Sequence, residues 1–291
     1  MFGECHGHII MDGRNYKQAV AIHKDGVKEE DIRRKLALYQ KAGVTFLRDG
    51  GDALGVSEYT KRIAPEYGID YRTPIYAIHK NGHYGGIVGL GFDTMKEYRH
   101  LVETVRQKKG DFIKVMFSGI MDFASDGGVT GTPLDRAEIR EMIHIAHEEG
   151  FAVMAHVNGA RTVQDAIEAG VDSIEHGNFM DEECLQALAE STAVWVPTIV
   201  TVHNLYGCGR FDDVVIERLR NLQASKIREA FAENAIVALG SDAGAYLVPH
   251  GQGIWDEYHV FQRILQNTAD LDSRLKRAEE EIQARFQRTS D

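Results

Sequence analysis

Short runs of hydrophobic residues alternate along the chain with longer segments that are hydrophobic on one side only. The short runs are rich in β-branched and aromatic residues, which is typical of buried strands. They occupy Phe2–Ile10, Val44–Arg48, Arg72–Ile78, Phe112–Phe117, Phe151–His156, Ser173–His176, Val194–Val200 and Ile236–Gly240. The longer segments repeat hydrophobic residues every three or four positions, as amphipathic helices do. They occupy Lys28–Ala42, Thr94–Lys108, Asp135–Glu149, Ala160–Ala169, Asp181–Glu190 and Val214–Glu233.

Strand-then-helix alternation of this kind predicts an α/β fold with parallel strands and helical crossovers. Eight predicted strands in a chain of 291 residues favour a (β/α)8 TIM barrel formed by a single domain, residues 1–291. An open doubly wound sheet is the alternative, but the chain lacks the early GxGxxG turn that would support a dinucleotide site. The charged segment Ser273–Arg288 predicts a final helix packed outside the barrel, within a helical tail over residues 273–291.

The charge and the cysteine content indicate which binding partners and which cellular compartment to expect. The 44 acidic and 33 basic residues give a formal net charge of −11, which argues against nucleic acid or an anionic membrane as partner. No signal-peptide pattern opens the sequence, and no run of 18 apolar residues could span a membrane. Three widely spaced cysteines favour a reducing cytoplasm over a disulfide framework. We therefore expect a cytoplasmic protein that acts on a small molecule, either as a monomer or as a homo-oligomer.

Side chains able to bind metal stand within or directly after several of the predicted strands. They are His6, His8, Lys114, His156, His176 and Asp242. His6 and His8 are two residues apart, so on a strand both side chains face the same side. Taken singly, each residue type is more typical of a core histidine, an edge lysine or a helix cap. Because the carboxyl ends of barrel strands meet at one face, the six together predict a metal site there.

The order of these six residues, HxH followed by Lys, His, His and Asp, resembles the amidohydrolase superfamily. Phrases around them are similar to the imidazolonepropionase-like and Xaa-Pro dipeptidase-like branch: Val-Thr-Phe-Leu-Arg-Asp-Gly-Gly, Ile-Lys-Val-Met-Phe-Ser-Gly, Ala-His-Val-Asn-Gly, Ile-Glu-His-Gly, Trp-Val-Pro-Thr and Gly-Ser-Asp-Ala-Gly. The resemblance extends from the first predicted strand to the eighth. Members of that branch usually carry a small accessory β-sandwich, and for this chain we expect a barrel without it.

The resemblance implies two divalent metal ions, with zinc as the first choice and manganese, iron or nickel as alternatives. The HxH pair and Asp242 would hold one ion, and His156 and His176 would hold the other. Lys114 would bridge both ions as an N6-carboxylated side chain, since an ammonium group cannot ligate a cation whereas a carbamate supplies two anionic oxygens. The alternative is a one-metal site in which Lys114 stays cationic and pairs with an acid.

Such a site predicts hydrolysis of an amide-type C–N bond in a dipeptide, an N-acyl amino acid or a cyclic amide. A metal-activated hydroxide would attack, with Asp242 as general base and then general acid. Lactone or ester hydrolysis at the same two-metal site is one alternative. A metal-binding barrel without catalysis is an alternative of another class, although a purely structural metal needs neither an open position nor a base.

Loops that follow the strands supply further candidates. His203 and Tyr206, after the seventh strand, could donate a hydrogen bond to a developing oxyanion. Substrate could be bound by His83, Arg48 or His250; the alternatives are an exposed loop histidine for His83 and pairing with an acid for Arg48. The glycine-rich stretches His83–Gly91 and Ser125–Gly131 fit no phosphate-binding pattern, so we expect them to form loops over the barrel mouth.

Overall fold

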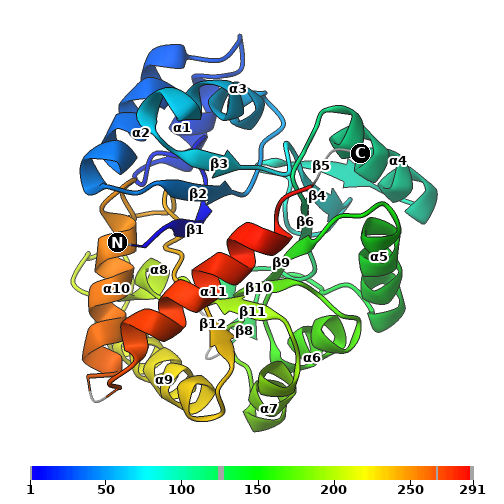
Figure 1. Ribbon diagram of the computed structural model, residues 1–291. Coiled ribbons are helices and arrows are strands. Elements are labelled where there is room, and N and C mark those ends of the chain that lie inside the picture. The colour runs from blue at the N-terminus through cyan, green and yellow to red at the C-terminus, as the bar shows by residue number, and fades with distance from the viewer. Residues whose placement is uncertain (1, 124–127, 267, 289–291) are drawn as a thin grey trace.

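A computed structural model describes residues 2–123, 128–266 and 268–288, and helices surround its parallel strands (Figure 1). The first sheet has the order β1-β2-β3 and contains β1 (Glu4–Gly7), β2 (Phe46–Asp49) and β3 (Asp70–Arg72). The second sheet has the order β12-β11-β10-β9-β6-β4-β5. Its strands are β4 (Ala77–Lys80), β5 (Gly89–Phe92), β6 (Ile113–Met116), β9 (Val153–Val157), β10 (Ser173–His176), β11 (Val194–Val196) and β12 (Ile236–Val237). The pairings within both sheets are parallel, as the alternation predicted.

The helices follow the strands in sequence and pack outside them. They are α1 (Tyr16–Ala21), α2 (Glu29–Ala42), α3 (Val56–Ile63), the 3-10 helix η1 (Ala64–Tyr67), α4 (Met95–Gln107), α5 (Arg136–Glu148), α6 (Ala160–Glu168), α7 (Glu182–Glu190), α8 (Val200–His203), α9 (Asp213–Ala232), α10 (Gly253–Ile264) and α11 (Leu271–Arg285). Local sequence sets several ends: Thr94 and Glu97 form a capping box at the start of α4. A membrane-spanning helix would have to be longer and more apolar than any in the described part of the chain.

Hydrogen bonds join the two sheets on one side. The backbone N–H of Cys5 donates to the carbonyl of Leu239 at 3.2 Å, and that of Asp242 donates to the carbonyl of His6 at 2.8 Å. These bonds place the segment after β12 beside β1, which pairs with β2 on its other side. The α/β architecture is therefore barrel-like, and the ends of the strands are brought around a common centre (Figure 1).

The third predicted strand is wrong in its extent, because the chain breaks it in two. Thr73–Tyr76 separates β3 from β4, since Pro74 has no N–H to donate and Ile75 has a φ of 65°, which a strand cannot contain. β3 pairs with β2, whereas β4 pairs with β6. Because of the break, one continuous segment of chain pairs with β2 through β3 and with β6 through β4.

The glycine-rich stretch after β4 begins as turns and then forms β5 on the outer edge of β4, which its composition did not predict. Of the second glycine-rich stretch, residues 125–127 lie outside the described residues, and Gly128–Val129 (β8) pairs antiparallel with Met121–Asp122 (β7). Residues 289–291 of the predicted tail also lie outside the described part.

The final helix, α11, crosses the strands at the end where they begin (Figure 1). The backbone N–H of Gly3, just before β1, donates to the Glu279 carboxylate at 2.9 Å. Ile282 and Phe286 are fully buried and pack with Phe112, which directly precedes β6. The predicted helix is therefore present, and its apolar side covers one end of the strands.

The contribution of α11 packing to the stability of the protein can be measured at Ile282. We expect Ile282→Ala to lower the free energy of unfolding by about 2–4 kcal/mol, because it leaves a cavity in a fully buried cluster. Urea unfolding followed by circular dichroism measures the loss. A loss below about 1 kcal/mol would contradict this packing of α11.

Candidate metal centre

The six predicted metal ligands come together at the end of the strands opposite α11. Their side chains line a single cavity of about 550 Å³. Four of them lie within strands, in β1, β6, β9 and β10. His8 follows the end of β1 by one residue, and Asp242 follows the end of β12 by five. Asp242 reaches the site because its backbone N–H bonds to the His6 carbonyl.

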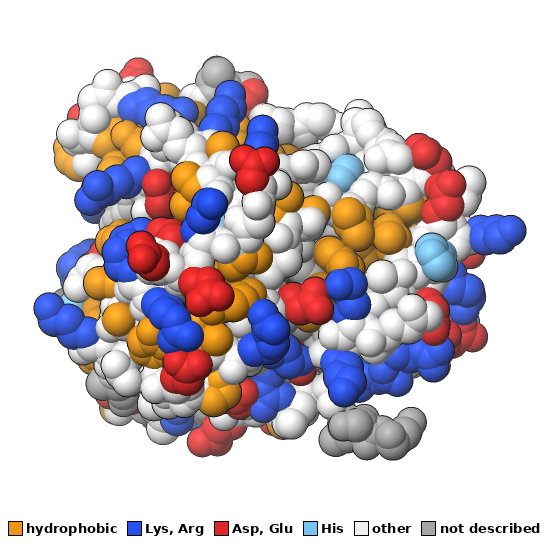
Figure 2. Space-filling view, turned by 90° about the horizontal axis from the view of Figure 1, so that it is seen from above, with side chains coloured by type: hydrophobic (Ala, Val, Ile, Leu, Met, Phe, Trp, Pro, Cys, Tyr) orange, Lys and Arg blue, Asp and Glu red, His pale blue; other side chains and the backbone are white. Residues whose placement is uncertain are grey.

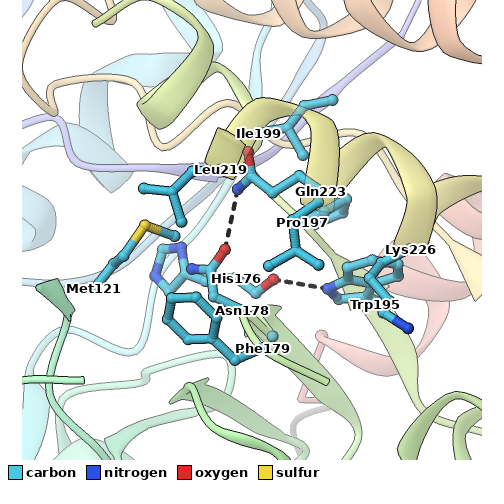
Figure 3. A pocket seen from close by; sticks show the side chains of 12 residues that line it. Met121, His176, Asn178, Phe179, Trp195, Pro197, Ile199, Leu219, Gln223 and Lys226 are labelled. Atoms are coloured by element: carbon cyan, nitrogen blue, oxygen red, sulfur yellow. Dashed lines mark hydrogen bonds between the residues drawn. The ribbon is translucent and has the colours of Figure 1, made fainter. Parts of the chain in front are cut away.

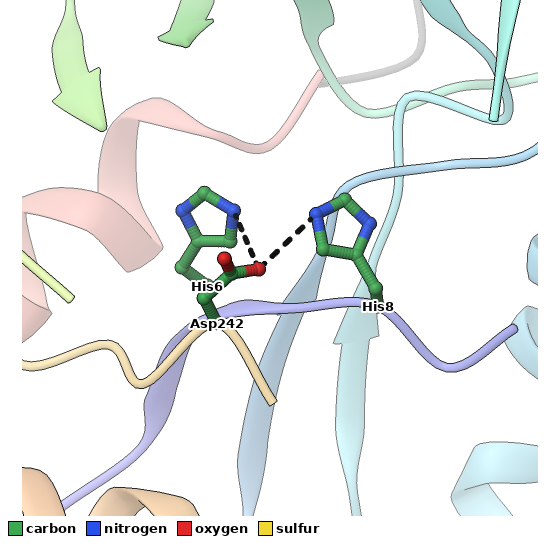
Figure 4. Close-up of side chains that lie close together, drawn as sticks. All are labelled: His6, His8 and Asp242. Carbon is green, nitrogen blue, oxygen red and sulfur yellow. Dashed lines mark ion pairs between the residues drawn. The ribbon is translucent and has the colours of Figure 1, made fainter. Parts of the chain in front are cut away.

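His6, His8 and Asp242 form the tightest group in the cavity. Both imidazole rings face the carboxylate of Asp242 (Figure 4). The Nε2 atoms of His6 and His8 lie 3.6 Å and 3.4 Å from Asp242 Oδ1. One candidate ligand atom from each residue lies within 4.8 Å of the other two, which is close enough to share one ion.

The other two histidines continue the group across the cavity. The ring centroids of His6 and His176 are 5.1 Å apart, and those of His176 and His156 are 4.6 Å apart. Lys114 lies on β6, which pairs directly with the strand that carries His156. Parallel pairing of β6, β9 and β10 therefore turns residues far apart in sequence into neighbours.

In three of these rings, one nitrogen lies within hydrogen-bond distance of an oxygen of the protein. His6 Nδ1 lies 2.6 Å from Glu175 Oε2, His176 Nδ1 lies 2.7 Å from Thr198 Oγ1, and His156 Nε2 donates to the Gly119 carbonyl at 3.0 Å. A carboxylate and a carbonyl only accept, so the opposite nitrogens of His6 and His156 carry a free lone pair, and the Thr198 hydroxyl can accept from His176 in the same way. This is how metal-binding histidines are usually oriented, with the other N–H bonded to a carboxylate, a carbonyl or another oxygen.

The backbone is strained where two of the ligands stand. His176 has a φ of 67° and Asp242 a φ of 59°, both in the left-handed region that non-glycine residues rarely adopt. Trp195 Nε1 donates to the His176 carbonyl at 2.9 Å and holds that turn, beside a small cavity of about 20 Å³ (Figure 3). Such strain is concentrated at functional sites and persists only where the surroundings enforce it.

Burial favours the uncharged form of the bases in the cavity. Lys114 is only 1% exposed, and its Nζ atom has no hydrogen-bond partner among the described residues. Burial lowers the pKa of Lys114 to about 8, and it lowers the pKa of His8 and of His156 to about 3. For Asp242, burial raises the pKa to about 8. In the absence of a cation, the site therefore favours neutral imidazoles over imidazolium.

The structure does not bring the two predicted oxyanion donors to this cavity. His203 ends α8, where its Nδ1 lies 3.4 Å from Arg220 Nε. Tyr206 is half exposed on the outside, with the Arg220 guanidinium over its ring. Neither side chain lines the cavity; that stretch contributes Thr201, Val202 and Leu205 instead. After β11 the chain enters the short helix α8, which places His203 and Tyr206 away from the cavity, and the strand-based expectation did not anticipate this.

The three predicted substrate residues also lie away from the cavity wall. His83 Nδ1 bonds to the Thr132 carbonyl at 2.8 Å. His250 is buried, with Nδ1 3.0 Å from the Tyr39 hydroxyl and Nε2 donating to the Met11 carbonyl at 2.8 Å. Arg48 is fully buried and pairs with Glu175, so the alternative of pairing with an acid describes it correctly. The polar groups of His250 and Arg48, and Nδ1 of His83, are bonded to the protein itself.

Several cavity residues had no clear signal in the sequence. The Tyr84 ring, directly after His83, lies 4.8 Å from the ring of His156. Three cationic side chains line the cavity besides Lys114: Arg14, Lys17 and Arg210. Adjacent residues in a loop point in different directions, and within the phrase Lys-Asn-Gly-His-Tyr-Gly-Gly it is Tyr84 and Gly85, not His83, that line the cavity.

Comparison with solved structures agrees with this architecture. A Xaa-Pro dipeptidase structure superposes with a TM-score of 0.74 at 21% identity, over 97% of this chain and 75% of that one. The structure of Aspergillus niger ochratoxinase superposes with a TM-score of 0.73 at 20% identity, over 97% of this chain and 68% of that one. At these identities the likeness concerns the fold, which is TIM-barrel-like.

Sequence comparison finds more limited matches to curated proteins. An uncharacterized protein of Mycobacterium tuberculosis is 31% identical over 133 residues, which is 43% of this chain and 35% of that protein. Ochratoxinase of Aspergillus niger is 27% identical over 156 residues, which is 52% of this chain and 32% of the enzyme. The chain thus spans about a third of the length of the curated relatives it matches.

The sequence profile of the amidohydrolase family matches residues 29–272, which is most of the chain. The family predicted from the order of the six residues is thereby confirmed. The chain belongs to the amidohydrolase family of enzymes.

Proposed function

We propose that this protein is a metal-dependent hydrolase of an amide-type C–N bond. The observation that carries the proposal is the convergence of three buried imidazoles, the half-buried imidazole of His176, Asp242 and the unpartnered Lys114 on one cavity. The names of the family and of its structural relatives, a Xaa-Pro dipeptidase and an ochratoxinase, agree with hydrolysis of an amide bond. Lactones and esters could react at the same site, but no feature of the cavity favours them.

The donor set fits divalent metal ions. His6 Nε2 and Lys114 Nζ are buried and lack a hydrogen-bond partner in the described part of the chain. Buried polar atoms without partners are costly, and a cation would satisfy imidazole lone pairs. Nitrogen and carboxylate ligands suit zinc, and also manganese, iron or nickel. We propose two ions: one held by His6, His8 and Asp242, the other by the remaining two histidines.

Lys114 would bridge the two ions as its N6-carboxylated form. Formation of a carbamate requires the neutral amine, and burial favours that form by lowering the pKa of Lys114. The side chain is enclosed within a strand, with no acid hydrogen-bonded to its Nζ among the described residues. That environment argues against the alternative in which a cationic Lys114 is paired with a carboxylate.

When bound, the metal ions would supply Lewis-acid activation of water and of the substrate carbonyl. Asp242 would accept the proton of the attacking water and deliver it to the leaving nitrogen. In the metal-free site, burial raises the pKa of this carboxyl to about 8, which favours its protonated form. Tyr84 is the phenol on the cavity wall beside His156, and it replaces Tyr206 as candidate donor to the substrate carbonyl.

The cavity wall favours a substrate that carries a carboxylate. Among the described residues, Asp242 is the only acidic side chain in the wall, although the whole chain has a net charge of −11. Arg14, Lys17 and Arg210 stand on the wall instead. The Arg210 guanidinium lies 4.8 Å from the Tyr246 ring centroid, and stacking of this kind leaves the in-plane N–H groups free for an anion. An N-acyl amino acid or a dipeptide would present such a carboxylate.

A polyanionic partner would need a basic surface, and the face drawn in Figure 2 carries charges of both signs. Figure 2 shows acidic and basic side chains interspersed over one face, with hydrophobic side chains between them. We therefore retain a small molecule as the substrate. A fully closed (β/α)8 barrel is the proposed architecture, and the bonds between β1 and the segment after β12 support closure. A cytoplasmic location remains a prediction from the sequence.

Metal content and an amide screen test the function. We expect about two equivalents of divalent metal in the purified protein, loss of activity with a chelator, and recovery with zinc or manganese. Elemental analysis and a panel of dipeptides, N-acyl amino acids, cyclic amides, lactones and esters provide the measurements. Bound metal near zero would overturn the proposal. Faster turnover of lactones or esters than of any amide would change the bond assigned, and bound metal without turnover of any panel member would favour the non-catalytic barrel.

Asp242→Asn tests the proton-transfer role. The amide is similar in size and retains an oxygen ligand but cannot act as a base, so we expect kcat to fall at least about 1,000-fold with most of the metal retained. Steady-state kinetics and metal analysis of the same sample make the comparison. Activity within tenfold of the original protein would remove Asp242 from that role.

The metal-free form of the same variant provides a control on electrostatics. An acid whose pKa is raised in the folded protein stabilises the fold fully below its unfolded value of 3.8, and this stabilisation is lost as pH rises towards about 8. We therefore expect metal-free Asp242→Asn to be more stable than the original protein at pH 8, and the difference to shrink towards pH 5. Chemical unfolding at both pH values measures the difference.

Arg210→Gln tests recognition of the carboxylate. Removal of a charge-assisted hydrogen bond should lower kcat/KM for an N-acyl amino acid about 10- to 100-fold, while the corresponding carboxamide should be little affected. Arg140→Gln is the matched control, because Arg140 is exposed on α5 and does not line the cavity. Equal losses on both substrates would contradict the assignment.

A further inference from the structure

The metal-facing nitrogen of His6 is determined by a carboxylate on the other side of its ring. His6 Nδ1 lies 2.6 Å from Glu175 Oε2, and both residues are fully buried. A carboxylate only accepts, so Nδ1 is the protonated nitrogen and Nε2 carries the free lone pair. His6 Nε2 is the atom that lies 3.6 Å from Asp242 Oδ1. The tautomer of His6 therefore depends on Glu175.

Glu175 depends in turn on Arg48. Its second oxygen, Oε1, accepts from Arg48 at 2.8 Å and from the Ser173 hydroxyl at 2.5 Å. Arg48 is also fully buried, and it donates from Nε to the Cys5 carbonyl at 2.6 Å. That carbonyl belongs to the peptide bond directly before His6. Arg48 thus holds both the backbone of His6 and the carboxylate that orients its ring.

The guanidinium of Arg48 stacks on the residue that caps the end of α11. The Phe286 ring, just past the end of α11, lies 4.4 Å from the guanidinium carbon. Phe112 supports the arrangement, with its ring perpendicular to that of Phe286 at 5.3 Å. An aromatic face is a favourable surface for a guanidinium whose in-plane donors are already used. Contacts thus run without a break from α11 to a candidate metal ligand.

We propose that Phe286, Arg48 and Glu175 are positioning residues for His6, so that α11 contributes to metal affinity from the opposite end of the strands. None of the three lines the cavity. The inference rests on the proposed metal site, which provides the reason for orienting His6. A purely structural role for the buried ion pair is the competing explanation, since such pairs are not by themselves evidence of stability.

Two readouts separate these explanations. Zinc affinity is measured by competition with a chromophoric chelator, and the His6 tautomer is measured by nitrogen-15 NMR of the metal-free protein, assigned with His6→Phe. For Glu175→Gln we expect a zinc dissociation constant 10- to 100-fold higher and loss of the pure Nδ1–H tautomer. For Phe286→Leu we expect a smaller weakening of zinc binding, about three- to tenfold.

Ile282→Ala is the matched control for α11. Ile282 lies on the same helix and in the same buried cluster, but it has no ring on which a guanidinium could stack. We expect it to lower stability while the zinc dissociation constant stays within twofold of the original value. Ser173→Ala removes one hydrogen bond from each partner of the ion pair and keeps both charges, so it replaces Glu175→Gln if that variant does not fold.

An unchanged tautomer together with zinc affinity within twofold in Glu175→Gln, or in Ser173→Ala in its place, would overturn the proposal. If Phe286→Leu and Ile282→Ala weakened zinc binding equally, the part of the proposal that concerns α11 would be wrong. If the original protein binds no zinc, manganese, iron or nickel, the proposed function fails, and the tautomer measurement still decides whether Glu175 orients His6.

Discussion

The site depends on one constraint: polar groups buried among parallel strands must be satisfied without water. Four imidazoles, a lysine and a carboxylate share a cavity in which burial opposes charge on every one of them. On the outer side of three rings, one nitrogen lies within hydrogen-bond distance of a protein oxygen. These oxygens belong to Glu175, to Thr198 and to the Gly119 carbonyl. On the inner side, His6 Nε2 has no hydrogen-bond partner among the described residues, which is the arrangement that a metal ion completes.

The same constraint explains why the ligands stand at the ends of strands. Within a strand, the ladder of hydrogen bonds satisfies the backbone, but it also fixes the direction of each side chain. At His176 and Asp242 the chain leaves that geometry and adopts positive φ values, and bonds from Trp195 and to His6 hold it there. A backbone in this conformation is costly, so the folded framework has to enforce it.

The two ends of the strands differ in character and are nevertheless connected. One end opens into a cavity with basic and aromatic side chains on its wall, and the other is covered by the apolar side of α11. Arg48 lies between them, buried completely, with its charge opposed by Glu175 and its flat face on Phe286. This pair could be exchanged for apolar residues if stability were its only role. Its contact with His6 gives a reason for its presence at this position.

The sequence by itself determined most of the elements and which six residues are candidate metal ligands. Period-two and period-3.6 patterns depend on which side of each segment is buried, so they predicted parallel strands and their crossover helices. The six candidate ligands were predicted from their residue types at these strands and from the resemblance to the amidohydrolase superfamily. Only the tertiary structure decided what the loops do. It placed Tyr84 rather than His83 on the cavity wall, turned Tyr206 outward, and assigned Arg48 to the ion pair with Glu175. The physical reason is that a loop side chain takes its direction from contacts with distant segments, whereas a strand side chain takes it from the alternation of the chain itself.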